Sequence, residues 1–138
     1  MKLVLDTNIF FSLMNQVSTA SYLFSSLRAE FSAPEFIKSE IKEHKPECLL
    51  KSGLSEHEFE IRQKSVEDDI KSIKASEYEE FLERAIKALP DPDDADFVAS
   101  ALFADAAIWS NDPHLKQQSL VSVFTTAELV RLFLKGEL

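Results

Sequence analysis

Cysteine and glycine are scarce in this chain of 138 residues, which contains one Cys and two Gly. Cys48 has no partner, which excludes an internal disulfide framework and a zinc site built on cysteines and fits a reducing, cytoplasmic compartment. The two glycines form no phosphate-binding loop, so nothing in the sequence indicates a nucleotide cofactor. Proline is also infrequent, with five residues, and the composition predicts a compact protein.

Long apolar runs are missing as well. No run approaches the roughly 20 residues of a membrane span. The first run reaches Asp6 too soon to be a signal peptide, so we expect no contact with a membrane. A chain of this length with 45% apolar residues can build one proper core. We therefore expect residues 1–138 to form a single domain.

Basic residues are in the minority, because 15 Lys and Arg face 24 Asp and Glu, for a net charge of −9. A charge of this sign argues against loose, nonspecific attraction to nucleic acid. The acids are concentrated between residues 77 and 96, where eight acids face Arg84 and Lys87, a local charge of −6 (2 minus 8). Any polyanionic ligand must therefore be attracted locally, by bases such as Lys38, Lys42, Lys45, Lys116 or Arg131.

Short apolar runs alternate with amphipathic segments along the whole chain. Strands are expected at Lys2–Leu5, Phe31–Ala33, Ile70–Ile73, Ala106–Ser110 and Leu120–Phe124. Helices are expected at Ser18–Glu30, from near Pro34, and at Ser55–Asp69, Ser76–Leu89, Asp94–Phe103 and Thr125–Leu134. Three of them open with a capping box: Ser55-x-x-Glu58, Ser76-x-x-Glu79 and Thr125-x-x-Glu128. This order is typical of a three-layer α/β domain with a central, mainly parallel β-sheet flanked by helices.

Two acids follow predicted strands. Asp6 comes after the first strand and Asp112 after the strand that ends near Ser110. Ligands of open α/β sheets bind outside the carboxyl ends of the strands, which makes both acids candidates for a site. Each could instead only cap the next helix, and Asp112 followed by Pro113 suits that role well.

Two further acids lie on faces of predicted helices that should be buried. Glu40 falls within the apolar stripe of Phe36, Ile37 and Ile41, and Asp94 is in phase with the apolar face of its own helix. A first-turn acid that favours the helix dipole is the plain alternative for Asp94.

Four carboxylates at one sheet edge would repel one another, and a divalent cation would cancel that repulsion. Oxygen ligands favour Mg²⁺ or Mn²⁺ over zinc, and such a cation serves phosphodiester hydrolysis without a nucleophilic side chain. The three histidines, His44, His57 and His114, show no paired metal-ligand spacing, so surface or packing roles are expected for them.

These motifs together resemble a PIN-domain protein of the VapC-like toxin ribonucleases. The resemblance rests on Leu3–Asn8, Glu40, Asp91–Ala99 and Ile108–Asp112, and it covers nearly the whole chain. It implies a PIN fold, Mg²⁺- or Mn²⁺-dependent cleavage of single-stranded RNA, and a toxin role with an antitoxin protein as partner. The family's acidic quartet, which holds the metal, falls on Asp6, Glu40, Asp94 and Asp112, with Thr7, Asn8 and Ser110 in support. Residues 46–76 match no motif of the family.

Other functions stay open at this point. A phosphatase of the haloacid-dehalogenase type would need an aspartate at position 8, which is Asn8 here. A PIN fold that has lost its activity and acts as a binding or regulatory module is the stronger alternative, because the net charge disfavours RNA. We also expect a homodimer, because 11 Phe exceed what one small core can hide.

Overall fold

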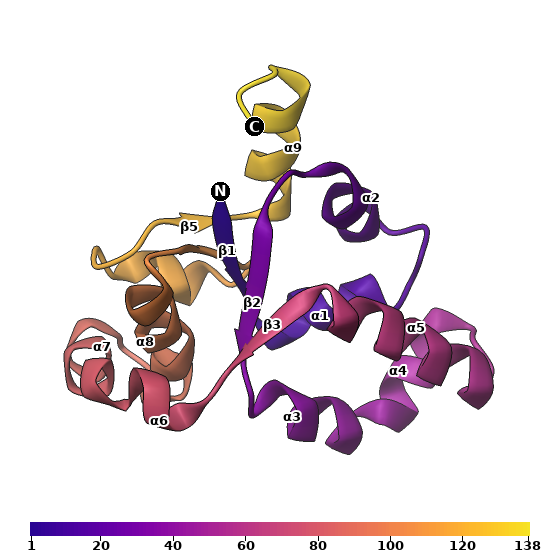
Figure 1. Ribbon diagram of the computed structural model, residues 1–138, viewed down its shortest axis with the longest axis horizontal. Coiled ribbons are helices and arrows are strands. Elements are labelled where there is room, and N and C mark those ends of the chain that lie inside the picture. Colours follow the sequence, from indigo (N-terminus) through magenta and orange to yellow (C-terminus); the bar gives the residue numbers. More distant parts are fainter.

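The computed structural model describes residues 1–138 as an α/β domain in which a sheet of five strands carries helices on both faces (Figure 1). The strands are β1 (Lys2–Leu5), β2 (Glu30–Pro34), β3 (Ile70–Ile73), β4 (Ala107–Trp109) and β5 (Val123–Phe124). Their order in the sheet is β3-β2-β1-β4-β5, and every neighbouring pair is parallel. The predicted three-layer fold with a parallel sheet is confirmed.

Helices connect the successive strands, as is typical of α/β domains. They are α1 (Thr7–Leu13), α2 (Thr19–Ser26), α3 (Ile37–Glu43), α4 (Lys45–Ser52), α5 (Glu56–Asp68), α6 (Ala75–Tyr78), α7 (Leu82–Ala88), α8 (Ala95–Ala104) and α9 (Thr126–Leu134), with short 3-10 turns η1 (Glu79–Phe81), η2 (Pro92–Asp94) and η3 (Pro113–Gln117). None of these helices combines the length and the apolar character that crossing a bilayer requires.

The alternation of side chains along β1 produces two cores. Leu3 and Leu5 point into a core of 18 buried residues, which they share with α1, α2, α3 and α5. Val4 points to the opposite face, into a core of 12 buried residues shared with α8. Figure 1 shows the corresponding layers, with α6, α7 and α8 on one side of the sheet and α1 and α5 on the other.

The segment that matched no family motif is an integral part of the fold. It forms α4, α5 and β3, and β3 pairs with β2 at the edge of the sheet. Cys48, Phe59 and Val66 from this segment are buried in the larger core. The predicted capping box of α5 is present, since Ser55 and Glu58 bond each other's backbone N–H groups at 3.1 Å.

Two predicted helices are shorter than expected. The segment Ser76–Leu89 is divided into α6, η1 and α7, and its N-terminal bond runs from the N–H of Lys74 to Glu77 (3.1 Å) instead of joining Ser76 and Glu79. The buried Tyr78 ring anchors this break through a hydrogen bond to Asp96. The helix predicted to reach Glu30 ends at Ser26, because Leu27 takes an extended conformation that leads into β2.

The last strand is also shorter than the predicted Leu120–Phe124, because only Val123 and Phe124 pair with β4. The reason lies in the buried Gln118. Its Oε1 accepts from the N–H groups of Leu120 (2.9 Å) and Val121 (3.0 Å), and its amide donates to the carbonyl of Leu115 (2.8 Å). These bonds hold the backbone of residues 118–121 in a turn, so it is not free to join the sheet.

Candidate active site

The carboxyl ends of β1 and β4 form the switch point of the sheet. These strands are neighbours, and the chain adds β2 and β3 on one side of them and β5 on the other. In open α/β sheets the crevice at such a point receives ligands. Asp6 directly follows β1, and Ser110 directly follows β4.

Asp6 is held through both carboxylate oxygens. The side chain is only 5% exposed. Its Oδ1 accepts the N–H of Ile9 at 2.8 Å, which caps α1, and its Oδ2 accepts a short hydrogen bond from the hydroxyl of Ser110. The carboxylate therefore has a fixed orientation at the crevice.

Ser110 connects the two strand ends. It is fully buried, and its hydroxyl oxygen also accepts the backbone N–H of Asp112 at 3.0 Å. The Oδ1 of Asp112 accepts the backbone N–H of His114 at 2.9 Å, and it lies 3.1 Å from Nδ1 of the His114 ring. Asp6 and Asp112 are thus helix caps, and both are also linked to Ser110. The capping role expected as an alternative therefore does not exclude a place for either acid in the crevice.

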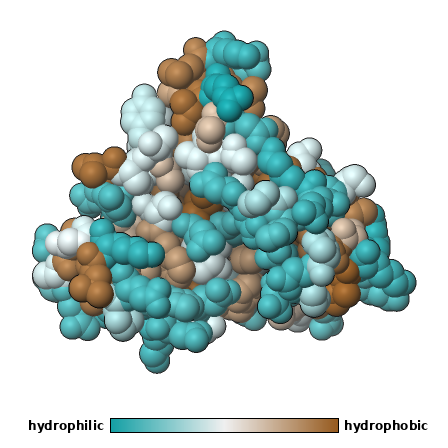
Figure 2. All heavy atoms as spheres, turned by 180° about the vertical axis from the view of Figure 1, so that it is seen from behind, coloured by the Kyte–Doolittle hydropathy of each residue, from teal (hydrophilic) through white to brown (hydrophobic).

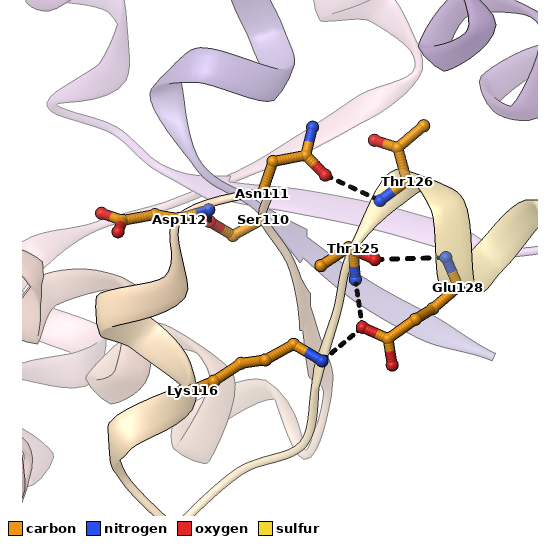
Figure 3. Close-up of polar contacts among 7 residues, drawn as sticks. All are labelled: Ser110, Asn111, Asp112, Lys116, Thr125, Thr126 and Glu128. Carbon is orange, nitrogen blue, oxygen red and sulfur yellow. Dashed lines mark hydrogen bonds and ion pairs between the residues drawn. The ribbon is translucent and has the colours of Figure 1, made fainter.

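A polar network fixes the loop after β4 against the start of α9 (Figure 3). Asn111 accepts the N–H of Thr126 at 2.8 Å, and Lys116 forms an ion pair with Glu128. Glu128 also completes the predicted capping box with Thr125. This network positions the segment that carries Asp112.

The four acids predicted from the sequence line one pocket of about 700 Å³. Asp6 comes from the end of β1, Glu40 from α3, Asp94 from η2 and Asp112 from the loop after β4. Thr7 and Asn8 of α1 also line the pocket. Its seven acids face only two basic side chains, and these acids are Asp6, Glu40, Glu47, Asp93, Asp94, Asp96 and Asp112.

Burial raises the pKa of three of these carboxyl groups. Desolvation is the main cause for Asp6, Glu40 and Asp94. The charge of Asp112 raises the pKa of Asp6 and Asp94 further, whereas Thr7 and His44 partly offset the rise at Glu40. The site is therefore a cluster of carboxylates whose ionised forms are costly until a counter-charge is present.

The donors around the pocket suit a hard divalent cation, because they are carboxylate oxygens together with the hydroxyl of Thr7. That hydroxyl is buried and lies close enough to Glu40 to ease the rise of the Glu40 pKa, but it makes no hydrogen bond of normal geometry. No three His, Cys, Asp or Glu side chains of the chain converge closely enough to hold an ion as they stand. The buried Asp6 and the half-buried Glu40, Asp94 and Asp112 therefore line the pocket without forming a preassembled cation site.

Several residues of the pocket were not predicted from the sequence. Asp96 lines the pocket, and its Oδ2 accepts the hydroxyl of the buried Tyr78 at 2.8 Å. Phe11 and His44 meet edge to face at the rim, with ring centres 5.9 Å apart. Lys51 is the one Lys or Arg side chain that lines the pocket. It reaches the pocket only because α4 folds back toward α1, which no spacing in the sequence signals.

The bases that the sequence suggested for attracting a polyanion lie outside the acidic pocket. Lys45 is paired with Glu56 and Glu60, each at 3.2 Å, and Lys116 with Glu128. Lys38 lines a separate, smaller cavity. None of the five bases named from the sequence lines the acidic pocket.

The raised pKa values predict that the acidic pocket destabilises the metal-free protein at neutral pH. A carboxyl whose pKa is higher in the folded state binds more protons there, so stability falls as pH rises from the unfolded pKa through the folded one. We expect Asp94→Asn to increase the free energy of unfolding at pH 7 by less than about 1 kcal/mol, after allowance for solvent screening. Urea unfolding in EDTA measures this change. Glu80→Gln, at an exposed and unpaired position outside the pocket, serves as control, and equal effects of the two substitutions would contradict the prediction.

The fold and pocket define an α/β domain with an acidic crevice at the switch point of a parallel sheet. The family model of the PIN domain matches residues 4–131, and the chain belongs to the PIN-domain family. PIN domains are in general nucleases. None of the curated protein sequences matches the chain.

Solved structures show the same fold. VapBC2 from Rickettsia felis, bound to a DNA fragment from its promoter, matches with a TM-score of 0.63 and 13% identity, over 91% of this chain and 98% of that chain. FitAcB from Neisseria gonorrhoeae matches with a TM-score of 0.60 and 15% identity, over the same shares of the two chains. At these identities the similarity concerns the fold.

Proposed function

We propose that the protein is a metal-dependent endoribonuclease that hydrolyses phosphodiester bonds of single-stranded RNA. One observation carries the proposal: acids from four separate segments, Asp6, Glu40, Asp94 and Asp112, line one pocket at the switch point of a PIN domain. Carboxylates whose pKa is raised by burial and by the charges of neighbouring acids are suited to a divalent cation.

The four acids would hold Mg²⁺ or Mn²⁺, which would activate water and stabilise the charged leaving oxygen. Within this site Asp6 provides the fixed carboxylate, because Ile9 and Ser110 hold its two oxygens. Ser110 supports the site by setting the distance between the two strand ends. Thr7 offers an unpartnered hydroxyl beside Glu40, and Asn8 a side-chain amide at the pocket wall.

A toxin role with an antitoxin partner is part of the proposal, and it is supported by the likeness to VapBC2 and FitAcB. Large apolar side chains are exposed near the tip that α2 and α9 form, with Tyr22 at 58% and Leu134 at 75%. Figure 2 shows apolar atoms gathered at this tip of the molecule. Such side chains suit a protein partner or a second copy of the chain, and the homodimer stays a prediction.

The proposal is tested with purified protein and single-stranded RNA. We expect cleavage with Mn²⁺ or Mg²⁺, complete loss in EDTA, and recovery when the metal is added back. Cleavage should rise with pH over a range above the ordinary carboxyl pKa, because the acids must ionise to bind metal. Cleavage that persists in EDTA would overturn the proposal.

A binding or regulatory module without activity is the alternative. It is favoured by the net charge of −9 and by the wide spacing of the carboxylates. Calorimetry with Mn²⁺ separates the two functions. A nuclease binds the ion and cuts RNA, whereas an inactive module neither cuts RNA nor loses ion binding when Asp6 is replaced by Asn.

A further inference from the structure

A second cavity, of about 390 Å³, adjoins the acidic pocket. The two cavities share Asn8, Phe11 and Lys51, so they lie side by side on the surface. The other residues of the second cavity come from α1, the α1–α2 connection and α4, and they are Ser12, Asn15, Ser18, Cys48 and Ser52. We refer to this cavity as the α1–α4 groove.

The charge of the α1–α4 groove is opposite to that of the pocket. None of its eight residues is acidic, and Lys51 is its only charged group. Lys51 is exposed and forms no ion pair, unlike the neighbouring Lys45, which is neutralised by Glu56 and Glu60. A backbone with one negative charge per nucleotide would be repelled by most of the pocket rim and attracted here.

The groove also presents unused hydrogen-bonding groups. The side-chain amide N–H groups of Asn8 and Asn15 donate to no other residue, and the Oδ1 of Asn15 accepts only the N–H of Val17 (3.1 Å). The hydroxyl of Ser12 donates to the carbonyl of Asn8 (3.1 Å), which leaves its oxygen free to accept. Free donors suit phosphate oxygens, and free acceptors suit base or ribose hydroxyl groups.

Phe11 lies where the pocket and the groove meet. It is half-buried against the core and lines both cavities. An aromatic ring at such a junction is suited to stacking against a base whose phosphate lies on either side.

We propose that the α1–α4 groove receives the single strand of RNA next to the bond that is cut, with Lys51 contacting a backbone phosphate and Phe11 a base. This inference rests on the proposed nuclease function. It gives the negatively charged protein a local route for a polyanion that enters the acidic pocket, through a base that the sequence did not single out.

Lys51→Gln tests the groove, because it removes the charge and keeps a polar side chain. We expect KM for a single-stranded RNA of ten nucleotides to rise about five- to tenfold, with kcat within twofold of the wild type. The slope of log KM against log salt should decrease by about 0.7, the value for one lost phosphate contact on a single strand. A dinucleotide, which is too short to fill both cavities, should show a smaller rise of KM than the ten-nucleotide RNA.

The control is Lys64→Gln, which makes the same change in net charge on α5. Lys64 is exposed and lines neither cavity. An equal rise of KM in both variants, or a fall of kcat in Lys51→Gln at constant KM, would overturn the groove as the route of the strand. If the wild type cuts no RNA, the proposed function fails. The dissociation constants of fluorescent RNA for the two variants then still decide whether the groove binds the strand.

Discussion

Replacing Asp6 by Asn is expected to reduce the turnover of RNA roughly 100-fold or more while the fold stays intact. The structure explains why the two effects separate. Asn keeps Oδ1, which accepts the N–H of Ile9, and Asn caps helices as well as Asp does. The amide of Asn can also donate to the hydroxyl oxygen of Ser110. Only the negative charge of the most deeply buried acid in the pocket is lost.

Turnover measured with Mn²⁺ and the unfolding curve of the same preparation test this prediction. Asp69→Asn is the matched control, because it removes one charge from an exposed position outside the pocket. Turnover of Asp6→Asn within twofold of the wild type would mean that Asp6 acts only as a cap. A large loss of stability would mean that the bond from Ser110 needs the carboxylate itself.

Phe59→Ala is expected to lower the free energy of unfolding by about 3–5 kcal/mol. Phe59 lies on α5, in the segment that matches no family motif, yet its ring is completely buried in the larger core. Removing the ring leaves a cavity that the surrounding side chains of the larger core cannot fill without moving. A loss of this size is a large share of the 5–15 kcal/mol that stabilises a typical domain.

Ile61→Ala provides the comparison on the same helix. Ile61 is 58% exposed, so its substitution should cost less than about 0.5 kcal/mol. Urea unfolding of both variants measures the difference. If Phe59→Ala costs as little as Ile61→Ala, α5 is an appendage and the domain does not depend on it.

The order of strands and helices could be predicted because each element carries its own pattern. The run Lys2–Leu5 and the boxes at Ser55 and Thr125 are local signals, and the structure contains all of them. Even the weak strand Ile70–Ile73, in which only Ile73 is buried, lies where it was expected.

The errors arise where contacts distant in sequence override local preference. The turn held by Gln118 shortens the last strand, and the bond from Tyr78 to Asp96 interrupts a predicted helix. For the same reason the candidate site was predicted only in part. Strand ends and helix phase indicated Asp6, Glu40, Asp94 and Asp112, whereas Lys51 reaches the pocket through the packing of α4.

The bridge from Asp6 through the hydroxyl of Ser110 to the backbone of Asp112 has a consequence for the timing of folding. Asp6 and Ser110 are 104 positions apart in the sequence, so the hydrogen bond between them forms only after β4 has paired with β1. Helices such as α5 form from local contacts, whereas closing so long a loop is slow. A chain still emerging from the ribosome carries Asp6 and Glu40 without Asp112. The complete acidic crevice, and the RNA cleavage proposed for it, therefore cannot arise before β4 has been synthesised and has paired with β1.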